Sequence, residues 1–144
     1  MIKIDIDVDL GSTIATLDGM IARSKNFAPT FKFAQARLQK ANALNFTTGG
    51  LPVGGWNPRS SPAPWPLMRR GGALMGSLTS LVGSPNQIGA TSAQFGTDVE
   101  YAKFHQSGTS KMPARKIVFE PKGFAEEVGI HAANHILGMG RYFQ

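Results

Sequence analysis

The sequence predicts a single α+β domain spanning residues 1–144, in which helices pack against a small mixed sheet. Three observations support this fold class. Residues 2–8 alternate aliphatic and charged side chains, as a strand with one buried face does. Two later segments repeat apolar residues every three or four positions, as amphipathic helices do. The 144 residues are enough for one hydrophobic core, and the absence of cysteine excludes disulfide scaffolds and thiol chemistry.

The composition favours a protein that covers part of its surface with partners. Only 17% of the residues are charged, while Gly and Pro number 17 and 9, both above their usual share. An unusually loop-rich monomer would have the same composition, so both interpretations stay open. No apolar run is long enough to span a membrane, and the N-terminus lacks the apolar segment of a signal peptide. We therefore expect no membrane partner and a location in a cytoplasm.

Two helices are expected after the strand at residues 2–8. Asp9 or Ser12 can cap the first helix, and Thr30 can cap the second, which follows Pro29 and runs to about residue 44. The apolar stripes are Leu10, Ile14, Leu17 and Ile21 on the first helix, and Phe27, Phe31, Ala34, Leu38 and Ala41 on the second. Lys32, Arg37 and Lys40 fall on the opposite side of the second helix. One face of that helix should therefore pack and the other should be basic.

Residues 46–66 form a predicted long loop that contains four glycines, five prolines, Trp56 and Trp65. Loops of this length are uncommon unless they bind something or are disordered. Exposed indoles are typical of a surface that contacts a partner. The loop is therefore expected to be a contact arm, unless both indoles pack back onto their own core.

The second half of the chain predicts shorter elements. We expect a helix over residues 67–82, a weak hairpin over 83–97 and a short helix over 101–106 that ends at Gly108. A short apolar strand is predicted at 117–119. A last helix starts at Glu120 and Pro121 and runs to about residue 138, with Glu126 and Glu127 near its positive end.

No catalytic constellation is present in the sequence, so we expect a protein that is not an enzyme and binds no cofactor or metal. His131 and His135 have the i, i+4 spacing that lets two imidazoles share a metal ion. However, Ala132 stands where a zinc protease of this pattern has its glutamate, and no third ligand is evident. Packed or interfacial histidines are the favoured interpretation.

Eight cations and no acidic residue occur between residues 23 and 70: Arg23, Lys25, Lys32, Arg37, Lys40, Arg59, Arg69 and Arg70. Within a formal net charge of +6, this stretch could face nucleic acid, an acidic protein partner or solvent. No recognised DNA-reading module accompanies it, so any DNA binding should be independent of sequence.

Residues 101–119 hold the most distinctive motif, Tyr-Ala-x-x-His-Gln-x-Gly, a short gap, Pro-Ala-Arg and an apolar stretch. Upstream, the segment Gly-Ala-Leu-Met-Gly-Ser-Leu of residues 72–78 follows the tryptophan-rich loop. From about residue 56 to 119 the chain resembles the bacteriophage virion-morphogenesis and tail-completion proteins. It departs from their pattern at Met75, where the family usually has Arg, and at Lys116, where an apolar residue or Pro is common.

The resemblance implies a structural virion protein of the head–tail neck that forms a ring, of six copies, around the DNA channel. Such a subunit completes the tail or joins it to the head. Its expected partners are its own copies, neighbouring neck and tail proteins and transiting double-stranded DNA. Its expected locations are the head–tail junction of the virion and, during assembly, the host cytoplasm. A tail terminator ring that caps the tail tube is one alternative, and a small non-specific DNA-binding protein is another.

A ring needs two different patches that meet head to tail, and several residues are candidates for them. The acidic N-terminal strand and the basic second helix are complementary in charge. Tyr101 and His105 share one helix side, and Arg115 can fork onto a carboxylate or a backbone carbonyl. The candidate interface residues are Asp5, Asp7, Trp56, Trp65, Tyr101, His105, Gln106 and Arg115. The candidate face toward the DNA channel or an acidic partner holds Lys32, Arg37, Lys40, Arg69 and Arg70.

Overall fold

The computed structural model describes residues 10–83 and 85–139, and the predicted strand at 2–8, with Asp5 and Asp7, lies outside them. The described elements are α1 (Gly11–Ser24), α2 (Ala28–Thr47), the 3-10 helix η1 (Leu51–Val53), α3 (Ala73–Ser80), β1 (Gln87–Ile88), β2 (Ala93–Gln94), α4 (Ala102–Ser107) and α5 (Phe124–Leu137). The chain is therefore a mixed α and β protein in which helices dominate.

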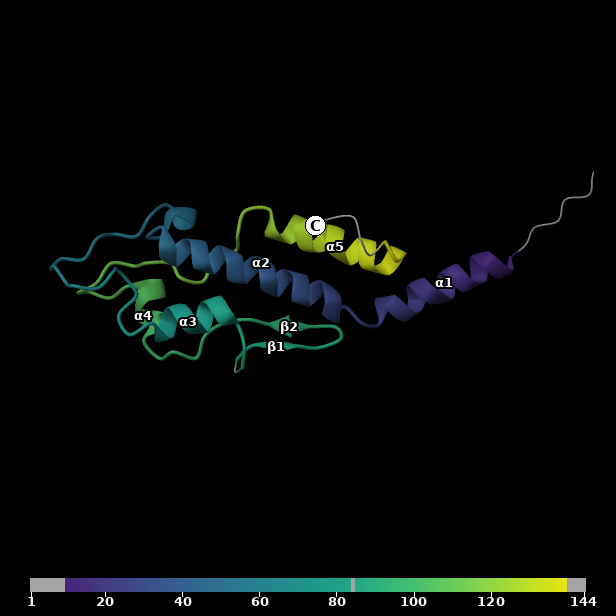
Figure 1. Cartoon of the computed structure of the whole chain (residues 1–144), viewed down its shortest axis with the longest axis horizontal. Helices are drawn as coiled ribbons and strands as arrows, with labels where there is room; N and C mark the ends of the chain where they lie inside the picture. The colour runs from purple at the N-terminus through teal and green to yellow at the C-terminus, as the bar shows by residue number, and fades with distance from the viewer. Residues whose placement is uncertain (1–9, 84, 140–144) are drawn as a thin grey trace, which may run out of the picture.

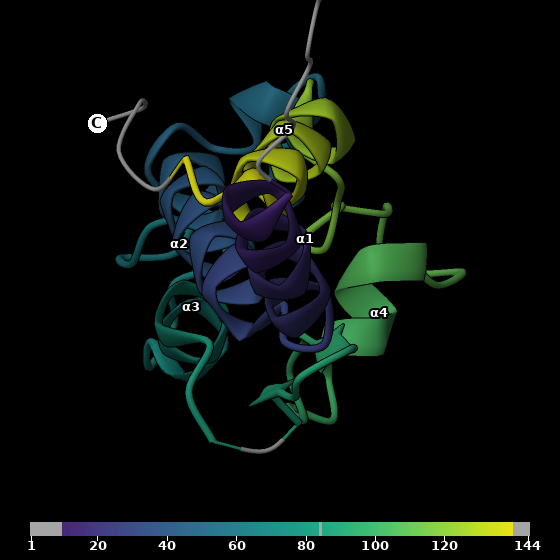
Figure 2. The same ribbon diagram turned by 90° about the vertical axis from the view of Figure 1, so that its right-hand side faces the viewer.

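Helix α2 is the central element of the fold. Figure 1 shows α5 along one side of α2 and α3 with the β hairpin along the other, while α1 extends beyond the end of this group. The view along the long axis in Figure 2 confirms that α3 and α5 cover different sides of α2. The molecule is thus a short helical layer with an arm at one end.

The hydrophobic core lies at the end of α2 that is far from α1. It consists of Phe46, Trp56, Leu74, Leu78, Ala102 and Ile117. The rings of Phe46 and Trp56 meet edge to face with centroids 5.4 Å apart, a favourable aromatic geometry. The core therefore joins α2, the segment after η1, α3, α4 and the chain before α5.

The start of α2 differs from the prediction. Pro29 lies in the first turn of the helix and Thr30 is buried inside it, so Thr30 is not the cap. Proline suits this position because the first backbone N–H groups of a helix have no partner within the helix. Asn26 Oδ1 accepts the N–H of Ala28 instead, at 3.0 Å. The helix also runs to residue 47, so the first two residues assigned to the 46–66 loop are helical.

Helix α3 is shorter than the predicted helix at 67–82. Gly71 and Gly72 both have positive φ angles, so the helix begins only after them, at residue 73. Three side-chain amides of α2, from Gln35, Gln39 and Asn42, donate to carbonyl oxygens at the end of α3 and just beyond it, on Leu81, Ser80 and Leu78. Because the last carbonyls of a helix lack partners within it, these amides fix a helix of only eight residues.

The described sheet is smaller than expected. The hairpin is confirmed, with β1 and β2 antiparallel and Gln87 opposite Gln94, but the described residues contain no mixed sheet. The strand predicted at 117–119 is wrong. The side chain of Gln106 accepts the N–H groups of Ile117 and Val118 and donates to the Val118 carbonyl. An extended segment can thus satisfy its backbone without a neighbouring strand.

Helices α4 and α5 both form where the sequence predicts helices, although α5 starts later than expected. Helix α4 is confirmed, and Gly108 follows it with φ +74°. A Cβ at Gly108 would lie 2.7 Å from the backbone nitrogen of Ala114, so both the backbone angle and the space require glycine here. Helix α5 begins at residue 124, later than Glu120 and Pro121, and carries Glu126 and Glu127 in its first turn as expected.

Candidate subunit interface

The apolar stripe of α1 is exposed in the described chain. Leu10, Ile14, Leu17 and Ile21 are each 52% to 58% accessible, and no residue of α1 is buried. The spacing of 4, 3 and 4 places them on one side of the helix. Contiguous apolar surface of this kind marks an interaction site more often than isolated exposed side chains do. The stripe is therefore the first element of a candidate subunit interface.

The base of α1 is fixed to α5 by an exchange of hydrogen bonds between helix ends. Arg23 Nε donates to the Ile136 carbonyl at 2.8 Å, near the end of α5. In return, Nε2 of His135 lies 2.7 Å from the Asn26 carbonyl and 3.2 Å from the Arg23 carbonyl. Both partners of Nε2 are acceptors, so this nitrogen carries the hydrogen. Each helix thus supplies a donor to the carboxyl end of the other, which sets the direction of α1.

His131 packs between α5 and α2. Its ring stacks on Phe33 with centroids 4.5 Å apart, and its Nδ1 lies 3.2 Å from Thr30 Oγ1. Burial, and then the nearby charge of His135, lowers the pKa of His131. Both histidines therefore have structural contacts. No three His, Asp or Glu side chains within residues 10–83 and 85–139 come together as a metal site would require.

The distinctive motif of residues 101–119 connects segments of the same chain. Arg115 is only 5% exposed, and it donates to the carbonyls of Asn57 and Pro58 at 2.9 and 3.0 Å. Of the two expected partners, backbone carbonyls are the ones present. The Arg115 N–H also donates to the His105 carbonyl, and Gln106 binds residues 117 and 118. These side chains organise the fold around the loop after η1.

His105 lies beside Arg115 in a partly buried position. Its ring meets Tyr101 edge-on with centroids 6.0 Å apart, and its Nδ1 is buried without a hydrogen-bond partner. Burial, and then the charge of Arg115, lowers the pKa of His105. Burial, and then the charge of Arg59, lowers the pKa of Arg115. Of the four candidate interface residues in the motif, Tyr101 is the exposed one.

The two tryptophans of the loop have different environments. Trp56 is 8% exposed, and its Nε1 donates to the Lys116 carbonyl at 2.8 Å, so it belongs to the core and is not available to a partner. Trp65 is 38% exposed, and the guanidinium carbon of Arg70 lies 4.9 Å from its ring centroid. Of the two indoles, only Trp65 is placed to contact another molecule.

The predicted basic face is partly neutralised. Arg37 forms a bidentate ion pair with Glu127 of α5, and one of the two hydrogen bonds measures 2.8 Å. Lys32 and Lys40 are exposed on α2, and Arg70 is exposed before α3. Arg69 is partly buried, and its Nε has no hydrogen-bond partner. Within this predicted face, the exposed cations are therefore Lys32, Lys40 and Arg70.

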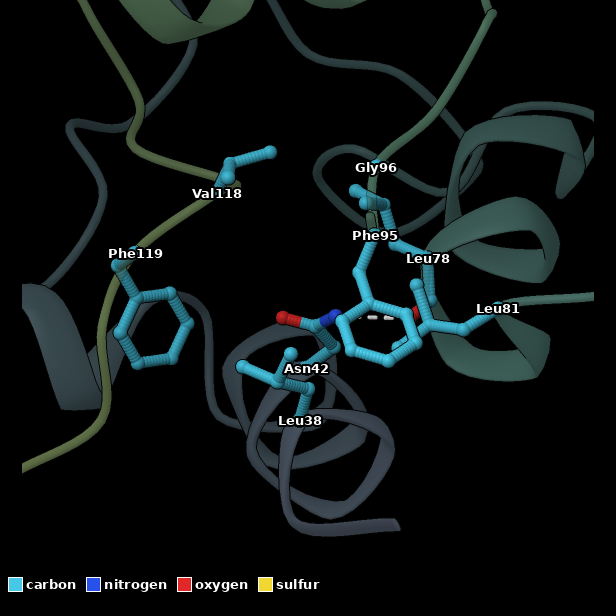
Figure 3. Close-up of a pocket in the computed structure, with 8 residues that line it drawn as sticks. All are labelled: Leu38, Asn42, Leu78, Leu81, Phe95, Gly96, Val118 and Phe119. Carbon is cyan, nitrogen blue, oxygen red and sulfur yellow. Dashed lines mark hydrogen bonds between the residues drawn. The ribbon is translucent and has the colours of Figure 1, made fainter. Parts of the chain in front are cut away.

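A shallow recess lies between α2, α3 and the segments around residues 95 and 118. Figure 3 shows its lining, which is Leu38, Asn42, Leu78, Leu81, Phe95, Gly96, Val118 and Phe119. The Asn42 amide donates to the Leu78 carbonyl at 2.7 Å. None of these lining residues is titratable, so the recess offers apolar contact and no acid–base chemistry.

Sequence reasoning missed two features of this surface. The amides of Gln35, Gln39 and Asn42 repeat at spacings of 4 and 3, a pattern that could have indicated a contact face on α2. The exposed side of α5 combines small residues with Ile130 and Leu137. The apolar periodicity of α5 is the same as that of a buried helix, so the sequence pattern did not reveal that this side is exposed.

No protein-family model, curated protein or solved structure matches this chain. Within the described residues, no helix has both the length and the apolar character needed to cross a bilayer.

Proposed function

We propose that this protein is a structural subunit of a phage head–tail neck, which completes the tail or joins it to the head as a ring of six copies around the DNA channel. One observation carries the proposal beyond the resemblance in sequence. Helix α1 projects from the body with four large aliphatic side chains more than half exposed. A subunit that is finished only by assembly has surface of this kind, whereas an independent monomer rarely does.

The arm suits a head-to-tail contact. A ring needs two different surfaces on each copy, one at each side of the subunit. Helix α1 supplies one of them, and its hydrogen-bonded base at α5 holds it in a defined direction. A preorganised arm loses less conformational freedom on docking than a flexible one does.

A modest basic surface is consistent with DNA passage. Lys32, Lys40 and Arg70 are exposed, while the charge of Arg37 is balanced by Glu127. Contacts to phosphates from a few cations are independent of sequence and weaken with salt. A channel lined in this way would bind DNA weakly and allow it to pass.

The experiment is a light-scattering mass measurement on purified protein at low and high salt, with and without duplex DNA. We expect a species of six times 15.4 kDa, about 92 kDa, that takes up little DNA. The variant Leu17→Lys should dissociate it, because a charge would have to be buried at the contact. Thr16→Lys is the matched control, since residue 16 lies away from the stripe on the same turn.

Two outcomes would contradict the proposal. A monomer that binds DNA tightly at low salt and releases it at high salt would indicate a non-specific DNA-binding protein. A monomer at every concentration, with Leu17→Lys indistinguishable from Thr16→Lys, would show that the stripe holds no copies together. A tail terminator would share the ring and would be distinguished by binding to the end of a tail tube.

A further inference from the structure

The outward side of α5 is a second apolar surface without a partner in the described chain. Ile130 and Leu137 are 46% and 49% exposed. A row at i, i+4 spacing, consisting of Ala125, Gly129 and Ala133, is exposed next to them. The short side chains of this strip leave a groove on the surface of α5. Another helix can therefore approach closely between the larger side chains beside it.

No close contact among the described residues requires glycine at position 129. A Cβ built at this position would meet no atom within 4 Å, and the residue lies in the middle of a 14-residue helix. Glycine in a helix interior costs about 1 kcal/mol relative to alanine. Close approach by another molecule is a use for a glycine here that the isolated chain does not provide.

We propose that the apolar stripe of α1 docks on the outward side of α5 of a second copy, so that α1 and α5 are the two unlike halves of the ring interface. This inference rests on the proposed function and names the partner surface for the arm. The two helices have the same length, 14 residues each. One presents a ridge of large aliphatic side chains and the other presents a strip of small ones, which is the complementarity that helix packing requires.

Charge is compatible with this pairing. Within the two helices, Asp18 lies next to the stripe of α1 and Glu126 lies on the exposed side of α5, while the exposed Lys25 and Lys122 flank the helices. The two helix faces themselves therefore carry few charges to desolvate, which keeps the electrostatic cost of docking low.

The arm of one copy is not placed to cover its own α5. The hydrogen bonds of Arg23 and His135 join α1 to the carboxyl end of α5, and from there α1 runs away from the body (Figure 1). The stripe of one copy and the α5 surface of the same copy therefore need different partners. This arrangement is heterologous, and it generates a ring where the rotation between successive copies closes.

The size of the contact favours a closed ring over a dimer. Each surface is one face of a single 14-residue helix, whereas a stable binary complex buries roughly 800 Å² per partner. An open dimer has one such contact, whereas every copy in a closed ring has two. We therefore expect cooperative assembly with few intermediates.

Cysteine cross-linking tests the pairing directly, because the chain contains no native cysteine. The double variant Leu17→Cys/Ala133→Cys, treated with a short bis-maleimide, should give a ladder of covalent oligomers that ends at the ring. A mixture of the two single variants should stop at cross-linked pairs. The double variant Thr16→Cys/Ala133→Cys is the matched control and should cross-link far less.

The other outcomes separate the inference from the proposed function. Efficient cross-linking of Leu17→Cys alone would mean that α1 pairs with α1, and a link within one chain would mean that α1 folds back, so either result overturns the inference. Absence of cross-links in a sample that keeps its six-copy mass would overturn the inference and leave the ring. If the protein without any substitution formed no six-copy species, the proposed function itself would be overturned.

A second variant should stabilise the folded subunit and at the same time weaken its assembly. Gly129→Leu should raise the melting temperature of the separated subunit by about 3 °C, because leucine is a better helix former. It should weaken assembly by on the order of tenfold or more, because the side chain fills the docking strip. Gly76→Leu, at an open glycine of α3, is the control and should leave assembly unchanged. Unaltered assembly of Gly129→Leu would overturn the pairing.

Discussion

Helices α1 and α2 follow one another in the chain, and each repeats apolar residues at spacings of three and four. None of the five stripe residues of α2 is exposed, because α3 and α5 lie on different sides of it (Figure 2). All four stripe residues of α1 are more than half exposed. The comparison teaches that apolar periodicity identifies a helix face suited to burial. Whether other elements of the same chain bury that face is decided by the tertiary fold.

The largest expected change in the free energy of unfolding comes from a substitution in α2. Phe46→Ala removes a fully enclosed ring that meets Trp56, and we expect a loss of about 3–5 kcal/mol in the free energy of unfolding. Chemical denaturation monitored by tryptophan fluorescence measures it. Leu44→Ala, at an exposed position of the same helix, should cost far less, and an equal loss would contradict the assigned core.

A smaller effect is expected where α2 holds α3. Asn42→Ala leaves the Leu78 carbonyl without its side-chain donor, and a buried unsatisfied group costs about 1–3 kcal/mol. Hydrogen exchange should show faster opening of α3 than of α5. If α3 and α5 opened to the same extent, the amide contacts would have no special role in holding α3.

Acid should loosen the contact between α2 and α5. The folded pKa of His131 is lowered from 6.5 by burial, so below about pH 6.5 the unfolded chain binds more protons than the folded one. Stability should therefore fall as pH drops from 6.5 toward the lowered folded value. His105 shares the direction of shift. Thermal melts of His131→Gln between pH 7.5 and 5 should show a shallower decline, and an unchanged slope would assign the effect elsewhere.

The smallest effect on stability is expected on α1. Ile14→Ala trims a side chain that is already 55% exposed, and alanine is a better helix former, so unfolding should change by less than about 0.5 kcal/mol. Assembly, measured by light scattering, should nevertheless weaken. A stability loss near that of Phe46→Ala would mean that the stripe is covered within one chain.

Several parts of the fold could be predicted from local chemistry. Apolar spacing predicts α1, but its predicted cap by Asp9 or Ser12 is wrong, because Leu10 precedes the helix without a side-chain cap and Ser12 lies inside it. The end of α4 follows from Gly108, and the hairpin follows from turn-forming residues. The shift of the α2 start arises because Pro29 fits a first helical turn as well as it ends a helix. The strand at 117–119 failed because Gln106, eleven residues earlier in the chain, satisfies the backbone groups that a neighbouring strand would otherwise need.

The candidate site was less predictable than the fold. The sequence pointed to both tryptophans and to Arg115, yet Trp56 and Arg115 hold the chain together from inside. Residue type alone cannot distinguish a large side chain that bonds within its own chain from one that contacts a partner. Both roles need a large side chain with a hydrogen-bonding end.

The sequence by itself determined the mixture of helices with a small amount of strand, the helical stripes, the absence of thiol chemistry and the excess of positive charge, because these depend on composition and spacing alone. Tertiary structure decided which apolar face stays uncovered, which cations are already paired and which aromatic residues are internal. Those outcomes depend on contacts between residues far apart in the chain, such as Arg37 with Glu127 and Arg23 with Ile136. The sequence of a helix does not by itself specify which distant segment packs against its apolar face.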